Sequence, residues 1–137
     1  MVLAQRLRPL LTRRTTFFRL YSMDATQKGF LTENCILVNR ADEPVGMASK
    51  KDCHLWENVK TGKMLHRAFS VLLFDDNNKM LLQKRASTKI TFPDYWTNTC
   101  CSHPLHVPGE MGPTSAEGVI QAARRKMTHE LGVPAQQ

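Results

Sequence analysis

The chain has 137 residues, enough for one domain with a hydrophobic core and too few for two. Hydrophobic residues make up 42% and charged residues 23%, as in globular domains, and no apolar run reaches the roughly 20 residues that span a bilayer. The net charge is +7, but five of the 19 basic residues lie in residues 1–22, which contain no acid. The remainder is nearly neutral, so no nucleic-acid partner is expected.

Residues 1–22 have the features of a targeting leader. The segment is rich in arginine, free of acid and contains several threonines. Its leucines lie on one helical stripe, at Leu3, Leu7, Leu10 and Leu11. The Arg19-Leu20-Tyr21 stretch resembles a mitochondrial processing site. We therefore expect a mitochondrial protein, and the alternative is a basic tail on a cytoplasmic or peroxisomal protein that starts at Met23.

The first half of the chain after the leader predicts short strands. Residues 23–33 are polar and predict a linker, which leaves residues 34–137 as the folded domain. Cys35 to Val38 predicts a strand, Asn39 to Pro44 a turn, and Val45 to Ala48 a second strand. Residues 49–65 predict a loop. His66 to Phe74 predicts a buried strand, joined by the Asp75–Asn78 turn to a partner strand from Met80 to Lys84.

The second half predicts a long loop followed by a helix. Residues 86–115 contain four prolines and predict an irregular region, which at this length is usually functional or disordered. Ser115 can cap a helix, in which the apolar residues recur at helical spacing from Val119 to Leu131, and Gly132 is a natural stop. Strands followed by one helix predict an α+β fold. One face of such a sheet would stay uncovered, so we expect the domain to be incomplete at its C-terminus.

The four cysteines favour reduced thiols over a disulfide framework. Cys100 and Cys101 are adjacent, Cys35 and Cys53 are far apart, and no C-x-x-C pair exists. Cys101 stands two residues before His103, within the long loop, and His54 and His66 lie upstream. Three imidazoles suit zinc, manganese or iron, although their spacing alone is weak evidence, since each is more often an ordinary surface or core residue.

The C-terminal helix resembles the Nudix box, a helix that holds divalent metal against a diphosphate. Glu117 is followed after seven residues by Arg125, and later by Glu130 and Gly132. Two glutamate positions of the box hold Lys126 and His129, and its leading glycine position holds Met111. These departures make diphosphate hydrolysis by the usual route doubtful. An ordinary amphipathic helix is the alternative.

Four segments, taken together, resemble the type I isopentenyl-diphosphate isomerases, which are Nudix-fold enzymes. They are Leu65-His-Arg-Ala-Phe-Ser70, Arg85-Ala-Ser-Thr-Lys-Ile-Thr-Phe-Pro93, Trp96-Thr-Asn-Thr-Cys-Cys-Ser-His-Pro104, and the helix from Ala122 to Gly132. The resemblance covers roughly residues 34–134. It implies a Nudix-like mixed sheet flanked by helices and the isomerisation of isopentenyl to dimethylallyl diphosphate in isoprenoid biosynthesis.

The resemblance also implies a role for individual residues and two kinds of metal ion. Cys101 would be the catalytic thiol, and Glu130 would help hold Mg²⁺ on the substrate diphosphate. A second divalent ion, Mn²⁺ or Zn²⁺, would bind to His54, His66 and His103. The small isoprenoid diphosphate would be bound by Lys50, Arg85, Lys89, Ser102 and Trp96, the last as a wall of the pocket.

The resemblance implies proton addition and removal by a thiol and a carboxyl. The glutamate that would supply this carboxyl, and a further glutamate ligand of the metal, would lie beyond residue 137, so we expect this chain to be a truncated form with little activity alone. Two other functions stay open: a Nudix diphosphate hydrolase, and a truncated product without catalysis. The oligomeric state does not follow from the sequence.

Overall fold

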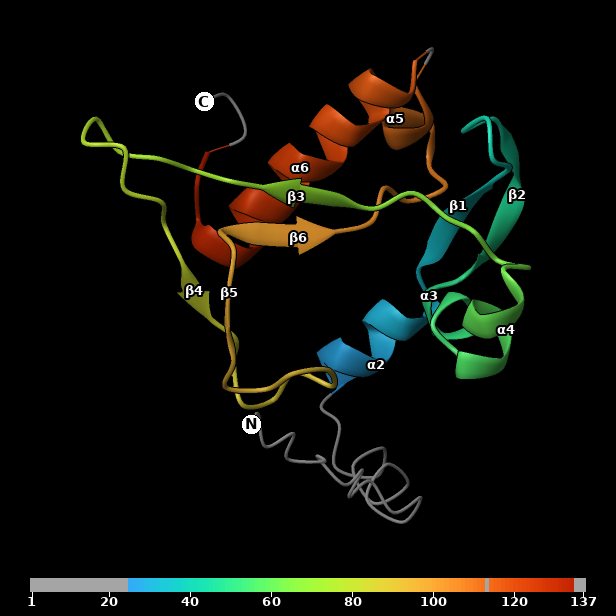
Figure 1. Cartoon of the computed structure of the whole chain (residues 1–137), viewed down its shortest axis with the longest axis horizontal. Helices are drawn as coiled ribbons and strands as arrows, with labels where there is room; N and C mark the ends of the chain where they lie inside the picture. The colour runs from blue at the N-terminus through green and yellow to red at the C-terminus, as the bar shows by residue number, and fades with distance from the viewer. Residues whose placement is uncertain (1–24, 113, 135–137) are drawn as a thin grey trace, which may run out of the picture.

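The computed structural model of the chain describes residues 25–112 and 114–134 (Figure 1). The expected leader, residues 1–22, lies outside this part. The described residues form helices, with strands paired in three two-stranded antiparallel sheets of order β1-β2, β3-β6 and β4-β5. The expected α+β class is therefore confirmed, with the sheet present as small antiparallel pairs. None of the described helices is long and apolar enough to cross a membrane.

The hairpin of β1 (Asn34–Val38) and β2 (Pro44–Ser49) has the predicted strands and turn. The Asn39 side chain holds the turn, because its Oδ1 accepts hydrogen bonds from the backbone N–H of Ala41 and Glu43 at 2.9 and 3.0 Å. The other edge of β1 pairs with distant segments, through bridges from Leu37 to His66 and from Cys35 to Leu105. This strand therefore organises the N-terminal part of the domain.

In the first half of the domain, three helices occur where the sequence predicted none. The expected linker contains α2 (Ala25–Thr32), which is anchored where the Phe30 ring meets the His129 ring at 5.3 Å. The expected loop of residues 49–65 contains α3 (Lys50–Cys53) and α4 (Trp56–Thr61). Ser49 caps α3 by accepting a hydrogen bond from Asp52 N at 3.1 Å, and Gly62 ends α4 with a left-handed φ of 64°.

The expected strand of residues 66–74 is shorter in the structure, as β3 (Phe69–Val71), and it pairs with β6 (Cys100–Ser102). The Asp75 turn is present, with Oδ1 accepting from Asn77 N and Lys79 N at 2.9 and 2.8 Å. Of the expected partner strand, only β4 (Gln83–Lys84) is regular, and it pairs with β5 (Trp96–Thr97). The residues 86–115 expected to be irregular thus hold two strands and a short helix, α5 (Pro108–Met111).

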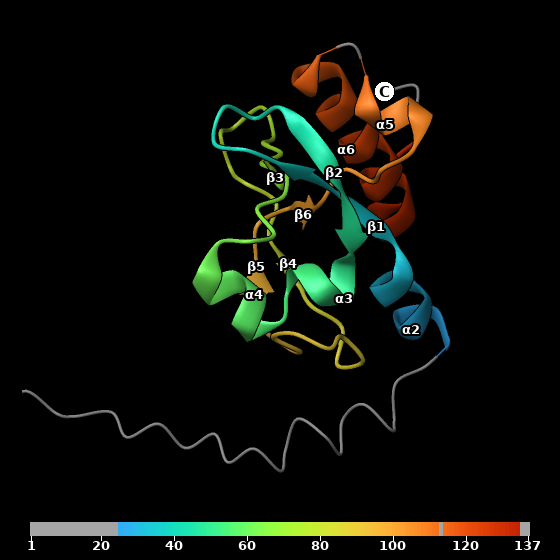
Figure 2. The ribbon, with the colours of Figure 1, turned by 90° about the vertical axis from the view of Figure 1, so that its right-hand side faces the viewer.

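The helix α6 (Ser115–Leu131) has the predicted extent, and Thr114 rather than Ser115 is its N-cap. It lies behind β3 and β6, with α5 beside its N-terminal end (Figure 1; turned in Figure 2). Gly118 makes this contact close, because a Cβ atom there would stand 2.1 Å from the carbonyl oxygen of Glu110. The side chain of Glu110 is buried and forms an ion pair with Arg125. Packing and charge together fix α5 on α6.

Buried apolar side chains are few in the described part of the chain. They are Cys35, Ile36, Val38, Cys53, Cys100 and Ala122. Large apolar residues stay exposed on the arms that flank the Asp75 turn, with Leu72 at 54%, Phe74 at 53% and Leu82 at 47%. Exposed apolar surface of this extent marks a face that binds another surface or ligand.

The packing at Gly118 predicts opposite effects for two Gly→Ala substitutions in helices. Gly118→Ala forces its methyl group against the backbone of Glu110, so we expect a loss of roughly 1–3 kcal/mol in unfolding free energy. Gly29→Ala in α2 meets no atom within 4 Å and should gain roughly 0.5–1 kcal/mol from helix propensity. Urea unfolding of both variants measures the effects, and equal effects would contradict the close approach.

Candidate metal and thiol site

Three histidines from separate parts of the chain meet in one cluster. His54 follows α3, His66 lies on the strand segment bridged to β1, and His103 follows β6. The ring centroids are 5.0 Å apart for His54 and His66, 4.8 Å for His54 and His103, and 5.0 Å for His66 and His103. One nitrogen of each ring lies within 4.8 Å of the others, which is close enough for a shared ion after small movements.

In His54 and His66, one ring nitrogen is hydrogen-bonded to the backbone, which orients the other nitrogen. The Nδ1 of His54 lies 2.7 Å from the Lys50 carbonyl, and the Nδ1 of His66 lies 2.9 Å from the Met64 carbonyl. Such contacts fix the tautomer of metal-ligating histidines and leave Nε2 unprotonated. Nδ1 of His103 is buried without a hydrogen-bond partner, a cost that an ion would remove. This donor set fits a divalent metal ion.

His103 is held neutral by its surroundings. Burial, followed by the electrostatic effect of His54, Lys50 and His66, lowers its pKa to about 3. A neutral imidazole is the form that binds a metal, so this ring stays available at neutral pH.

The adjacent cysteines of β6 point to different environments. Successive side chains of a strand face opposite sides, and here Cys100 is buried while Cys101 is exposed. The Cys100 Sγ lies 3.6 Å from Glu130 Oε2, and burial followed by that negative charge raises the pKa of Cys100 to about 11. Cys100 is therefore an unreactive structural thiol, whereas Cys101 is accessible and lies two residues from His103.

Glu130 lies at the centre of a charged group on α6. Its Oε1 lies 3.1 Å from the Lys126 ammonium and 3.4 Å from that of Lys89, and Gln83 donates to its Oε2 at 3.4 Å. Burial alone would raise the pKa of Glu130, but the two ammonium groups and these hydrogen bonds outweigh burial and lower it to about 2. The carboxylate is therefore ionised at neutral pH, as an Mg²⁺ ligand must be.

The other residues expected to bind the substrate come from separate elements of the chain. Lys50 pairs with Glu33 at 3.5 Å and lies close enough to His103 to affect its pKa. The Arg85 guanidinium donates to the carbonyl and hydroxyl of Thr91 at 3.0 and 3.2 Å, which holds the adjoining loop. Ser102 ends β6, and Trp96 is 69% exposed on β5.

Glu110, which is buried, and Arg125 form an ion pair that was not predicted from the sequence. Arg125 NH2 donates to Glu110 Oε2 at 2.9 Å and to the carbonyl of His103 at 3.4 Å. Glu110 Oε2 also accepts from Leu105 N at 2.7 Å. The pair thereby fixes the backbone that carries His103. The spacing of 15 residues across a helix break gives no sequence signal for it.

Comparison with known families gives the class of the chain. The model of the NUDIX domain family matches residues 64–137, which include β3, the β6 thiols and the whole of α6. The chain belongs to the NUDIX domain family.

Proteins named isopentenyl-diphosphate delta-isomerases are similar to this chain. One from Gibberella zeae is 56% identical over 83% of this chain and 46% of its own length. One from Schizosaccharomyces pombe is 54% identical over 82% of this chain and 50% of its own length, and one from Mus musculus is 50% identical over 84% and 50%. The chain thus spans about half the length of the curated relatives it matches.

The charges around Glu130 predict an acid-sensitive contribution to stability. Its folded pKa of about 2 lies below the ordinary 4.5, so the contribution is complete above pH 4.5 and is lost as pH falls toward 2. The loss should reach on the order of 3 kcal/mol in metal-free protein. Lys126→Met should flatten this dependence in urea unfolding at pH 5 and pH 3. Lys60→Met, in an exposed pair with Glu57, is the matched control and should leave it unchanged.

The histidine cluster predicts manganese binding that depends on His103. His103→Gln removes one of the three imidazole ligands. Mn²⁺ binding, measured by electron paramagnetic resonance, should weaken by more than the roughly 10–100-fold expected when a residue that only holds a metal ligand in place is replaced. His106→Gln, three residues along and outside the cluster, should bind Mn²⁺ like the unaltered chain. Equal affinities of the two variants would rule out the three-histidine site.

Proposed function

We propose that this chain provides the metal- and thiol-bearing part of an isopentenyl-diphosphate isomerase site. The observation that carries the proposal is the meeting of His54, His66 and His103, with the exposed thiol of Cys101 two residues before His103. Identities of 50–56% with isomerases from fungi and a mammal support the substrate class.

The reaction that we propose moves a double bond by adding one proton and removing another. An unactivated alkene is a weak base, so the site must present an acidic group at the terminal carbon and a base at the neighbouring methylene. Cys101 is an accessible thiol that can exchange a proton with the substrate. A divalent ion at the histidines supplies positive charge that stabilises an anionic oxygen or thiolate nearby.

Binding of the diphosphate is assigned to Glu130 and to the basic residues around it. Mg²⁺ usually takes one or two protein carboxylates and completes its shell with phosphate oxygens and water. Glu130 provides the ionised carboxylate, and Lys89 at 3.4 Å provides an ammonium that can turn to a phosphate oxygen. We also assign Lys50, Arg85 and Ser102 to the diphosphate, and Trp96 to the hydrocarbon part.

The substitutions in the Nudix box argue against a diphosphate hydrolase. Lys126 stands where the box has a glutamate, and its ammonium lies 3.1 Å from Glu130. It therefore puts a positive charge where a carboxylate would help hold a group of metal ions. His129, at the other altered position, packs its ring on Phe30 instead. One carboxylate is enough to bind Mg²⁺ on a substrate phosphate.

Water reaches the groups that we assign to the reaction. Trp96 is 69% exposed, and Cys101 is exposed as well. A carbocation formed in this setting would be trapped by water, because such chemistry needs a dry pocket. We therefore expect little turnover from this chain alone, and a surface that covers β5 and β6 should be needed.

A chimera tests the proposal directly. Residues 25–134 of this chain would replace the matching half of the isomerase from Schizosaccharomyces pombe, 54% identical in this region. We expect the chimera to convert isopentenyl diphosphate to dimethylallyl diphosphate without releasing phosphate, because the assigned residues are all present. Cys101→Ser should lower kcat at least a hundredfold, as expected for loss of a group that transfers a proton.

Two readouts make the result decisive. Metal content should be unchanged in Cys101→Ser, and Cys100→Ser, which changes the buried neighbour in the same strand, should keep most of the turnover. Undiminished turnover in Cys101→Ser would remove the thiol from the mechanism. Release of phosphate by the chimera would favour the hydrolase instead.

A further inference from the structure

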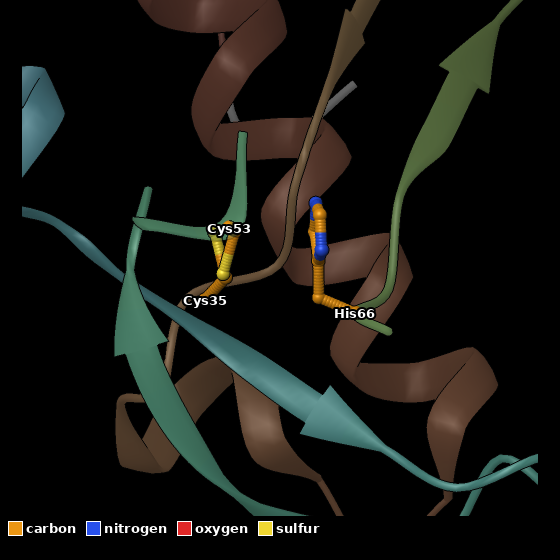
Figure 3. A group of neighbouring side chains, drawn as sticks. All are labelled: Cys35, Cys53 and His66. Atoms are coloured by element: carbon orange, nitrogen blue, oxygen red, sulfur yellow. The ribbon is translucent and has the colours of Figure 1, made fainter. Parts of the chain in front are cut away.

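A second group of potential ligands adjoins the histidine cluster and has no part in the reaction described above. It consists of Cys35 in β1, Cys53 at the end of α3, and His66 (Figure 3). Their ligand atoms, two sulfurs and one ring nitrogen, lie within 4.8 Å of one another. Residues from three separate segments thus present soft donors to one point.

The two thiols are enclosed by the fold. Cys35 is 0% and Cys53 1% exposed, and both are free thiols. Figure 3 shows their sulfur atoms turned toward each other. Cys53 Sγ also lies 3.8 Å from the Ala48 carbonyl, which directs its side chain toward β2. The hairpin and α3 therefore hold the pair in place before any ion arrives.

His66 connects this pair with the histidine cluster. Its Nδ1 is occupied by the Met64 carbonyl at 2.9 Å, so one nitrogen remains for an ion. His66 belongs to both groups of potential ligands, the one with Cys35 and Cys53 and the one with His54 and His103. An ion bound through the cysteines and an ion bound by all three histidines therefore compete for the same ring.

We propose that Cys35, Cys53 and His66 form a binding site for a thiophilic cation of the Cd²⁺, Zn²⁺ or Cu⁺ type. Thiolate sulfur selects such ions over the harder cations Mg²⁺ and Mn²⁺. A divalent ion forms two metal–sulfur bonds and one metal–nitrogen bond, and the two thiol protons pass to solvent. Occupation of this site draws His66 away from the other histidines, so thiophilic ions oppose Mn²⁺ binding there.

Cadmium binding to the whole chain tests the site without any assay of isomerase activity. Cd²⁺ added to metal-free, reduced protein should give the ultraviolet charge-transfer absorption of cadmium–thiolate bonds. Cys35→Ser and Cys53→Ser should each weaken Cd²⁺ binding by more than the roughly 10–100-fold expected when a residue that only holds a metal ligand in place is replaced. Each variant should also lower the cadmium–thiolate absorption. Cys101→Ser and Cys100→Ser, which alter the two thiols outside the group, are the matched controls and should keep it.

Two further measurements separate this site from the three-histidine site. His54→Gln should keep the cadmium–thiolate absorption while losing Mn²⁺ binding, because His54 belongs to one group only. The ¹¹³Cd chemical shift of the unaltered chain should report two sulfur ligands, which covers the case that a cysteine variant fails to fold. Absence of thiolate absorption, a shift without sulfur ligands, or loss of the signal in Cys101→Ser would each overturn the site. None of these outcomes bears on isomerase activity.

Discussion

The ion pair between the buried Glu110 and the half-buried Arg125 is the interaction on which the site depends. Glu110 binds the backbone N–H of Leu105, and Arg125 reaches the carbonyl of His103. The same segment is bonded to β1, since His106 N donates to the Asn34 carbonyl at 2.8 Å. One charged contact therefore ties α5, α6 and the segment after β6 to the N-terminal hairpin. Breaking a buried pair strands a charge in the interior, so this connection resists thermal opening.

Part of the fold could be predicted because its signals are local. The apolar spacing from Val119 to Leu131 and the stop at Gly132 specify α6, and two short strand-forming segments on either side of the Asn39 turn specify the first hairpin. Local signals also existed for α3 and α4, in the Ser49 cap and in Gly62, but polar composition concealed them. The pairing of β3 with β6 joins residues about thirty positions apart, and no local pattern specifies such a register.

Only part of the candidate site could be predicted from the sequence. Resemblance singled out the three histidines and Glu130, and the structure brings the histidines together while placing Glu130 between two lysines. The roles of these residues remain proposals. The pairing of Cys35 with Cys53 had no counterpart in the sequence, because α3, which orients Cys53, was itself unforeseen. Contacts between side chains that are distant in the sequence can be predicted only when the helices and strands that carry these side chains are known.

The alternation along β6 gives the chain a practical property. Of its four cysteines, three are sealed from solvent and Cys101 alone is open to it. An electrophile dissolved in water therefore meets a single nucleophilic sulfur, since the others present no surface to attack. A fluorophore or spin label attached there would report from one defined position, two residues before His103, without removal of any native thiol.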